Sequence, residues 1–122
     1  MIKGIGVDII ELKRIEKIIQ RKPRFLNRIL SDAEMTLYNQ LPSSKRKIEF
    51  LAGRFAAKEA YSKAEGTGIG VHHSFQSIEI LRGASGQPLI YREGKLKENV
   101  HLSISHSEAY AIAQVVIEHS LQ

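Results

Sequence analysis

The sequence contains no cysteine, so disulfide bonds and thiolate metal sites are excluded, and any bound metal must use oxygen or imidazole ligands. It also has no apolar run near the roughly eighteen residues of a membrane-spanning helix and no segment of secretory-leader type at its start. We therefore expect a protein with no membrane partner. A cytoplasmic location is expected, and the lack of cysteine agrees with it.

The composition is that of one folding unit. The 122 residues are 43% hydrophobic, and two ordinary domains would each be left with too little core. We expect a single compact domain over residues 1–122. Lysine and arginine number 18 against 13 acidic residues, giving a formal charge of +5, so an acidic partner is expected: a protein, a nucleotide or a nucleic acid. A modest cationic excess also fits an ordinary solvated surface.

Hydrophobic periodicity predicts an opening strand over residues 2–9 and an amphipathic, basic helix over residues 10–21. Asp8 is expected on the side of this strand opposite to three apolar residues, Ile5, Val7 and Ile9. Pro23 is expected to end the helix, with cationic residues continuing beyond it.

Capping signals predict two further helices. Ser31 and Glu34 have the spacing of a capping box, which predicts a short helix ending near residue 41. The serines just before residue 45 can cap a longer helix over residues 45–64, and Gly66 is expected to end it.

The second half of the chain has the alternation of strands, over residues 75–81, 87–91, 101–105 and 110–117. These segments predict an antiparallel meander to which the opening strand is added. The fold class is therefore α+β, with helices in the first half packed on a mainly antiparallel sheet.

Two carboxylates, Asp8 at the end of the opening strand and Glu59 on the long helix, are each expected to be partly buried. Buried acids need a cation, and two carboxylates completed by water and phosphate oxygens suit Mg²⁺. The alternative is that Asp8 is a hydrogen-bonding group at a strand end and Glu59 an ordinary ion-pair partner of Lys58 or Lys63.

Other groups suggest phosphate chemistry. Lys63 lies four residues after Glu59, so it either reaches a phosphate beside the metal or forms a simple helix ion pair. His106 begins a turn after a strand, where it can bind phosphate, move a proton or simply face solvent. The glycine-rich residues 66–70 follow a helix and are no P-loop, but their amides can approach a nucleotide. The other histidines have no convincing metal spacing.

Taken together, three separated segments resemble the holo-acyl-carrier-protein synthase family of small phosphopantetheinyl transferases. They are residues 4–12 (GIGVDIIEL), residues 54–60 (RFAAKEA) with Lys63 and GTG at 66–68, and residues 103–106 (SISH). The match covers essentially the whole chain in the expected order. The resemblance implies transfer of 4′-phosphopantetheine from coenzyme A to a serine of apo-acyl carrier protein. That reaction releases adenosine 3′,5′-bisphosphate, depends on Mg²⁺ and belongs to fatty acid and lipid biosynthesis.

The resemblance also implies roles for individual residues. It makes Asp8 and Glu59 the metal ligands, and Lys63 and His106 catalytic residues that also contact coenzyme A. Coenzyme A binding is further implied for Arg54, Gly66 and Thr67. The proton acceptor for the attacking serine is expected to be a metal-bound water, with Glu59 as the alternative.

The same resemblance implies a carrier-protein docking surface made of Arg14, Ile18, Arg21, Arg24 and Phe25. It also implies a homotrimer with active sites at subunit boundaries.

Two other functions fit parts of the sequence. A basic nucleic-acid-binding module would use the cationic residues of the first thirty positions, but it lacks an aromatic stacking motif and does not explain Asp8 with Glu59. We therefore expect no nucleic-acid partner. A nucleotide pyrophosphatase using the same metal would cleave the coenzyme without a carrier.

Overall fold

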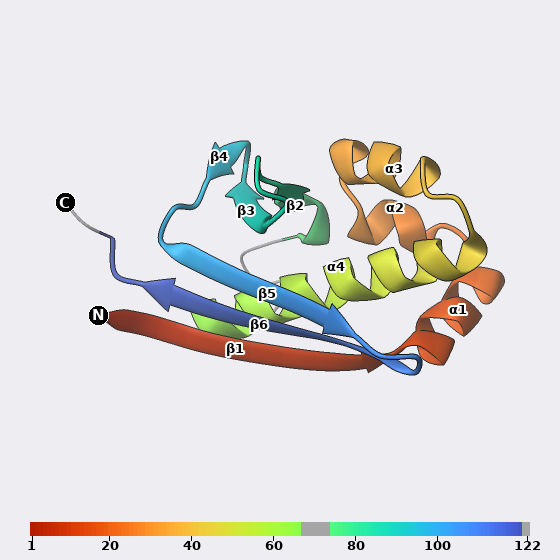
Figure 1. Ribbon diagram of the computed structural model, residues 1–122, viewed down its shortest axis with the longest axis horizontal. Helices are drawn as coiled ribbons and strands as arrows, with labels where there is room; N and C mark the ends of the chain where they lie inside the picture. Colours follow the sequence, from red (N-terminus) through yellow and green to blue (C-terminus); the bar gives the residue numbers. More distant parts are fainter. Residues whose placement is uncertain (67–73, 121–122) are drawn as a thin grey trace.

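The computed structural model describes residues 1–66 and 74–120, which form an α+β fold as predicted (Figure 1). The elements in chain order are β1 (Ile2–Glu11), α1 (Leu12–Arg21), α2 (Phe25–Ile29), α3 (Asp32–Asn39), α4 (Ser44–Glu65), a 3₁₀ turn η1 (Phe75–Ser77), β2 (Ile78–Arg82), β3 (Pro88–Arg92), β4 (Lys95–Leu96), β5 (Val100–His106) and β6 (Tyr110–Glu118). The long helix α4 lies along one sheet, and the shorter helices gather near its N-terminal half.

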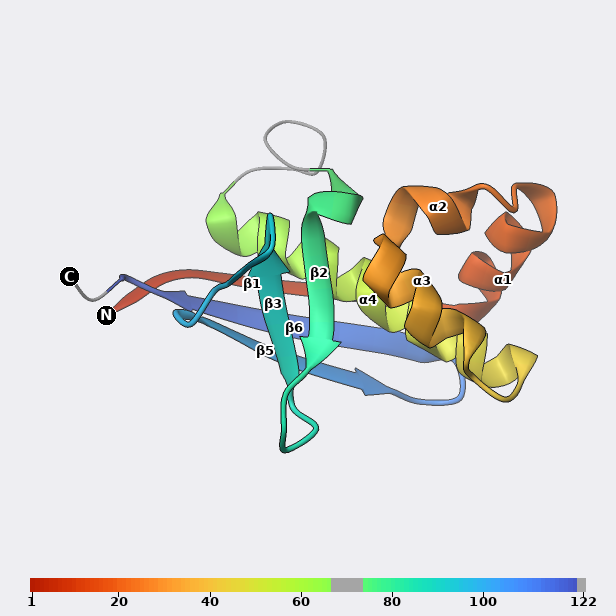
Figure 2. The same cartoon turned by 90° about the horizontal axis from the view of Figure 1, so that it is seen from above.

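The predicted single meander is wrong, because the strands form two separate antiparallel sheets. The first has the order β1-β6-β5 and the second the order β2-β3-β4. Figure 2 shows β2 and β3 running across β5 and β6 on the same side as α4. The opening strand does join a late strand, since β1 pairs with β6 along its length. Alternation along each strand was predictable, but which strands share a sheet depends on contacts distant in sequence.

Glycines let β1 lie directly against the backbone of α4. A Cβ atom built on Gly4 would be 1.9 Å from the carbonyl oxygen of Ala64, and one on Gly6 would be 1.9 Å from that of Ala60. No side chain fits at either position, so these glycines allow a closer approach than any other residue would. The alanines on α4 are small for the same reason, and both are buried.

The helix boundaries follow the predicted capping signals. Ser31 and Glu34 form the complete capping box of α3, and the Ser43 side chain accepts from the amide of Arg46 at the start of α4. Gly66 ends α4 in the left-handed conformation with φ 85°, as expected for a helix-terminating glycine. Helix α2 was not predicted, because five residues after Pro23 are too few to show a helical period.

The core lies between α4 and the two sheets. Its largest fully buried apolar side chains are Tyr61, Ile15, Ile29, Leu51, Ile78, Ile80, Ile90 and Ile117. In the part of the chain that the structure describes, no helix is both long and apolar enough to cross a membrane.

Candidate functional site

The acidic corner, defined here as Asp8, Glu59 and Lys63, is formed where β1 crosses the C-terminal half of α4. Asp8 shares a strand face with Gly4 and Gly6 because side chains two residues apart point the same way. The two glycines contact the carbonyl oxygens of Ala60 and Ala64, which directly follow Glu59 and Lys63 in the sequence. Close packing of strand on helix therefore brings the three functional groups to one place.

Within the acidic corner, Lys63 is the cation that contacts Asp8. Its Nζ donates to Asp8 Oδ1 at 3.0 Å and to the carbonyl oxygen of Val7, also at 3.0 Å. The Lys63 side chain is 54% exposed, whereas that of Asp8 is only 17% exposed. A phosphate can therefore reach the ammonium from solvent, whereas the carboxylate is mostly covered.

Glu59 completes the corner as a half-buried carboxylate. Burial raises its pKa above the ordinary value of 4.5, the negative charge of Asp8 raises it further, and Lys63 partly opposes this. A carboxylate whose ionisation is opposed by a neighbouring negative charge favours a bound cation. Among the residues described, no group of three or more His, Asp or Glu side chains could hold a metal by itself. Two carboxylates do suit Mg²⁺, which takes its other ligands from water and substrate phosphate.

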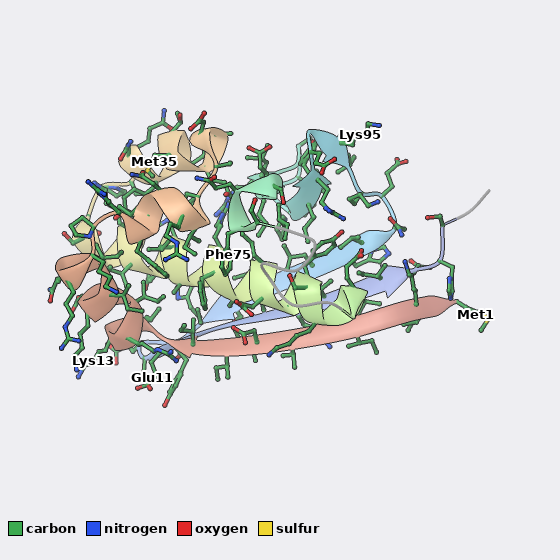
Figure 3. The ribbon with its side chains drawn as sticks, turned by 180° about the vertical axis from the view of Figure 1, so that it is seen from behind. Met1, Glu11, Lys13, Met35, Phe75 and Lys95 are labelled. Atoms are coloured by element: carbon green, nitrogen blue, oxygen red, sulfur yellow. The ribbon has the colours of Figure 1, made fainter. Side chains whose placement is uncertain are left out.

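A depression of about 760 Å³ opens beside Glu59. Its other lining residues come from the region of α2 and from the segment around η1: Arg24, Asn27, Arg28, Ser74, Phe75 and Gln76. Figure 3 shows Phe75 beside α4. The depression therefore joins a carboxylate of the acidic corner to cationic side chains at α2.

The anion pocket, defined here as the pocket of about 300 Å³ lined by Arg46, Arg54, Arg82 and His106, is separate from the acidic corner. Gly53 on α4 faces Ile104 on β5 in this pocket, whereas Lys63 faces β1. The predicted placement of His106 in a cleft is therefore found, but the structure does not bring it into the acidic corner.

Arg54 carries a buried positive charge into the anion pocket. It is 7% exposed, its Nη2 donates to the carbonyl oxygen of Ile80 at 3.2 Å, and its guanidinium carbon lies 3.9 Å from the centre of the Phe50 ring. Its Nε has no hydrogen-bond partner among the residues described. Burial lowers the pKa of Arg54 to about 10, with Glu34 opposing and Arg82 assisting this shift, so the group stays charged at neutral pH. An under-satisfied buried cation of this kind favours an anionic ligand.

Glu49 lies beside the histidine of the same pocket. Its Oε2 lies 3.6 Å from His106 Nδ1, and its Oε1 lies 3.9 Å from Arg46 Nε. Sequence analysis did not single out Arg46, Glu49 or Arg82. The spacing of Arg46, Glu49 and Gly53 on one helix face was a usable signal. Arg82 comes from β2, and nothing local connects it to that face.

The predicted docking residues lie on the surface of α1 and the start of α2. Arg14, Arg21 and Arg24 are exposed, while Ile18 and Phe25 are partly buried. A groove of about 450 Å³ is lined by Phe25, Pro23 and four cationic residues, Arg21, Lys22, Arg24 and Arg28. Charge and apolar surface are thus combined over these two helices.

Two expectations about individual residues have different outcomes. The alternative in which Lys58 pairs with Glu59 is wrong, because Lys58 is fully buried and its Nζ lies 2.5 Å from Glu34 Oε1. Gly66 is present as the exposed cap of α4, but Thr67 lies outside the described residues, so its expected contact with coenzyme A stays a prediction.

Comparisons with known proteins agree on one family. Residues 4–115 match the model of the 4′-phosphopantetheinyl transferase superfamily. A holo-[acyl-carrier-protein] synthase of Anoxybacillus flavithermus is 59% identical over 118 residues, covering 97% of each chain. The crystal structure of the Bacillus anthracis synthase in complex with CoA (3′,5′-ADP) is 51% identical, with a TM-score of 0.87 over 98% of this chain and 99% of that one. The Helicobacter pylori synthase in complex with coenzyme A is 39% identical, with a TM-score of 0.77 over 93% of this chain and 99% of that one.

Proposed function

The chain belongs to the 4′-phosphopantetheinyl transferase superfamily, and we propose that it transfers 4′-phosphopantetheine from coenzyme A to a serine of apo-acyl carrier protein. The observation that carries this proposal is the acidic corner, where Asp8, Glu59 and Lys63 meet in a chain that matches such synthases over nearly its full length. The products are holo-acyl carrier protein and adenosine 3′,5′-bisphosphate. Because acyl carrier proteins serve fatty acid synthesis, a cytoplasmic role in lipid biosynthesis is part of the proposal.

The reaction exchanges one phosphorus–oxygen bond for another. The serine oxygen forms a bond to the phosphorus on the pantetheine side of the coenzyme A pyrophosphate. The bond from that phosphorus to the bridging oxygen breaks, and the bridging oxygen leaves with adenosine 3′,5′-bisphosphate. The serine proton has to be accepted by a base, and the new negative charge on the leaving group has to be stabilised.

Asp8 and Glu59 are the residues that would hold Mg²⁺. Support for this comes from the chemistry of the pair: two oxygen donors, one little exposed and one with a raised pKa, in a chain that has no thiolate ligands. When bound, the ion would neutralise negative charge on the pyrophosphate and on the leaving group. Lys63 would add a second positive charge by donating to a phosphate oxygen.

Glu59 is the chain's own candidate for accepting the serine proton. It lines the depression that also contains cationic residues near α2. Its pKa is raised in the absence of a metal, and a bound Mg²⁺ would make it a weaker base, so the roles of ligand and base have to be separated by experiment. Replacement by glutamine keeps the shape and removes the basic group. If Glu59→Gln binds Mg²⁺ and coenzyme A normally but loses single-turnover activity, Glu59 is the base. If metal binding is lost as well, its main role is as a ligand.

The anion pocket is proposed to bind a phosphate of coenzyme A. Arg54 supplies a buried charge with an unpaired N–H among the residues described, and His106, whose Nδ1 lies 3.6 Å from Glu49, lines the same pocket. The Gly66 amide donates to the carbonyl oxygens of Lys63 and Ser62 as the cap of α4, so the expected contact of Gly66 with coenzyme A would have to use another of its atoms.

The docking surface on α1 and α2 is proposed to bind the carrier. Exposed arginines can attract an acidic helix, while Ile18 and Phe25 supply apolar contact once it is bound. Charge reversal at Arg14 or Arg21 is expected to raise the KM for the carrier and to flatten its salt dependence. An unchanged KM would remove this surface from the account.

Assembly into a homotrimer with sites at subunit boundaries is also proposed. The face of the first sheet opposite α4 exposes large apolar side chains: Ile5 at 58%, Val7 at 51%, Ile9 at 60%, Tyr110 at 45% and Ile112 at 41%. Cross-strand pairing places Ile9 beside Ile112. Side chains of β1 project away from α4 in Figure 3. A contiguous apolar face of this kind is typical of a subunit interface. Because the acidic corner and the anion pocket lie on different flanks of α4, coenzyme A could use one from each of two chains.

The transfer is tested by the mass of an apo-acyl carrier protein after incubation with this protein, coenzyme A and Mg²⁺. A gain of one phosphopantetheine unit is expected with the parent chain and not with Asp8→Ala. Cleavage of coenzyme A without a gain in carrier mass would favour the pyrophosphatase instead. The nucleic-acid alternative would be supported only if duplex or single-stranded DNA bound the protein and competed with the carrier for the docking surface.

A further inference from the structure

A fully buried ion pair lies at the junction of four elements. Glu34 of α3 and Lys58 of α4 both have side chains that are 0% exposed, and their charged atoms are 2.5 Å apart. Lys58 directly precedes Glu59, but successive residues of a helix project in different directions, so Lys58 points inward while Glu59 lines the depression. The reaction described above makes no use of this pair.

Glu34 is held by donors from three different segments. Its Oε1 accepts from the amide of Ser31 at 3.0 Å and from Lys58, and its Oε2 accepts from the amide of Ile80 at 2.9 Å. The capping box of α3 therefore fixes one end of the carboxylate, and the edge of β2 fixes the other. Burial lowers the pKa of Lys58, and the charge of Glu34 and its hydrogen bond oppose this.

The second contact of Lys58 reaches α2, the helix that begins at the docking residue Phe25. Its Nζ donates to the carbonyl oxygen of Ile29 at 2.6 Å, and Ile29 is the last residue of α2. A helix of five residues has little stability of its own. Helix α2 is also held by apolar packing, since Ile29 is 1% exposed in the core and the ring centres of Phe25 and Phe55 are 6.0 Å apart, and by an exposed bond from Gln76 to the Asn27 carbonyl. The bond from Lys58 adds a directional contact at the C-terminal end of the helix.

The geometry of the depression depends on where α2 lies. Arg24 and Arg28, which flank Phe25, line it together with Glu59. Lys58 thus connects the C-terminal end of α2 to Glu59, through one side-chain hydrogen bond and one peptide unit. Movement of α2 would change the distance from a bound carrier to the acidic corner.

We propose that Glu34 and Lys58 are positioning residues for the carrier: the buried pair holds α2 at a fixed distance from Glu59, so that the serine of a docked carrier meets the coenzyme at the acidic corner. The inference rests on the docking surface of the proposed function. A pair that served stability alone would be replaceable, because buried ion pairs can often be exchanged for uncharged residues without loss of stability. Positioning requires the hydrogen bond to Ile29 itself.

The test compares two kinetic constants in a variant without the charges. In the double variant Glu34→Gln with Lys58→Met, neither side chain is charged, volume is nearly kept, and the donor to Ile29 is lost. We expect its KM for apo-acyl carrier protein to rise about tenfold while its KM for coenzyme A stays within twofold. Ser31→Ala is the matched control. It removes the Ser31 Oγ that accepts from the Glu34 amide at 3.3 Å, but it leaves both buried side chains and Ile29 untouched. Its KM for the carrier should not change.

Lys58→Arg is a second test of the positioning role if the double variant is too unstable to assay. It keeps a positive charge beside Glu34, but its planar head cannot occupy the position of the ammonium between Glu34 and Ile29. We expect its KM for the carrier to rise at least threefold, again with little change for coenzyme A. A parental KM for the carrier in a folded variant would overturn the inference, and so would an equal rise of both constants.

Charge reversal at Arg21 separates failure of this inference from failure of the docking surface. If Arg21→Glu raises the KM for the carrier and the Lys58 variants do not, the docking surface stands and the positioning role is wrong. If none of these variants changes that KM, the docking surface itself is wrong, and the inference falls with it.

Discussion

Gly6→Ala tests how closely β1 must approach α4 for the acidic corner to form. The added methyl carbon would lie 1.9 Å from the carbonyl oxygen of Ala60, whereas real contacts of such atoms stay above 3.0 Å. Strand and helix must therefore separate by about 1.1 Å, since a Cβ atom is fixed by its own backbone and the carbonyl oxygen belongs to a helix, so neither can rotate away. Overpacking of this kind costs about 3 kcal/mol. For a chain of this size that lowers Tm by about 12 °C.

The loss of activity should exceed the loss of folded protein. Asp8 lies two residues beyond Gly6 on the same face of β1, so the shift moves it away from Glu59 and Lys63. A misplacement of about 1 Å can reduce turnover by about a hundredfold. Transferase kcat at 25 °C and thermal unfolding monitored by circular dichroism measure the two effects separately.

Gly83→Ala is the matched control for this prediction. Its new methyl group would be 2.8 Å from the side-chain amide of Gln87, which can move aside, so we expect a stability change within about 0.5 kcal/mol and parental activity. Parental Tm and kcat in Gly6→Ala would refute the reasoning, because they would mean that β1 and α4 do not need to be in backbone contact.

Three further predictions follow from other parts of the molecule. The raised pKa of Glu59 means that the protonated form is favoured in the folded chain and that ionisation opposes folding. Without metal, the stability contributed by the protonated form is complete below pH 4.5 and is lost as the pH rises through the raised pKa. Glu59→Gln should therefore melt higher than the parent at pH 7 but not at pH 4, and a lower Tm at pH 7 would contradict this. Ile112→Lys should give monomers in sedimentation with at least about tenfold lower activity, because a charge would enter the apolar face of the first sheet; an active monomer would exclude the proposed boundary sites. Arg54→Met should raise the KM for coenzyme A about tenfold or more without raising that for the carrier, which steady-state kinetics with each substrate varied would check.

Features set by neighbouring residues could be predicted from the sequence. The capping box of Ser31 and Glu34 and the cap at Gly66 depend on residues only a few positions apart, and the structure confirms both. The opening strand was predicted from alternation, and Asp8 does lie on the side opposite to Ile5 and Val7. Local chemistry is sufficient in these cases because both partners of each contact belong to one element.

Features set by distant contacts could not be predicted in the same way. Nothing near Lys58 identifies Glu34, 24 positions away, as its partner, and the nearer Glu59 was the natural alternative. The glycines of β1 were not predicted to contact α4, since a glycine in a strand pattern does not show which backbone approaches it. The split into two sheets and the separation of His106 from Asp8 likewise depend on how α4 crosses the first sheet.

Binding of Mg²⁺ in the presence of coenzyme A tests the central claim about the acidic corner most directly. Isothermal titration compares the Mg²⁺ affinity of the parent chain with that of Asp8→Asn. This substitution keeps the shape of the side chain but removes its charge. The account predicts one Mg²⁺ bound per chain in the parent, with affinity reduced at least about tenfold in the variant. Equal affinity in both proteins would contradict the assignment of Asp8 as a metal ligand, and with it the role of the acidic corner.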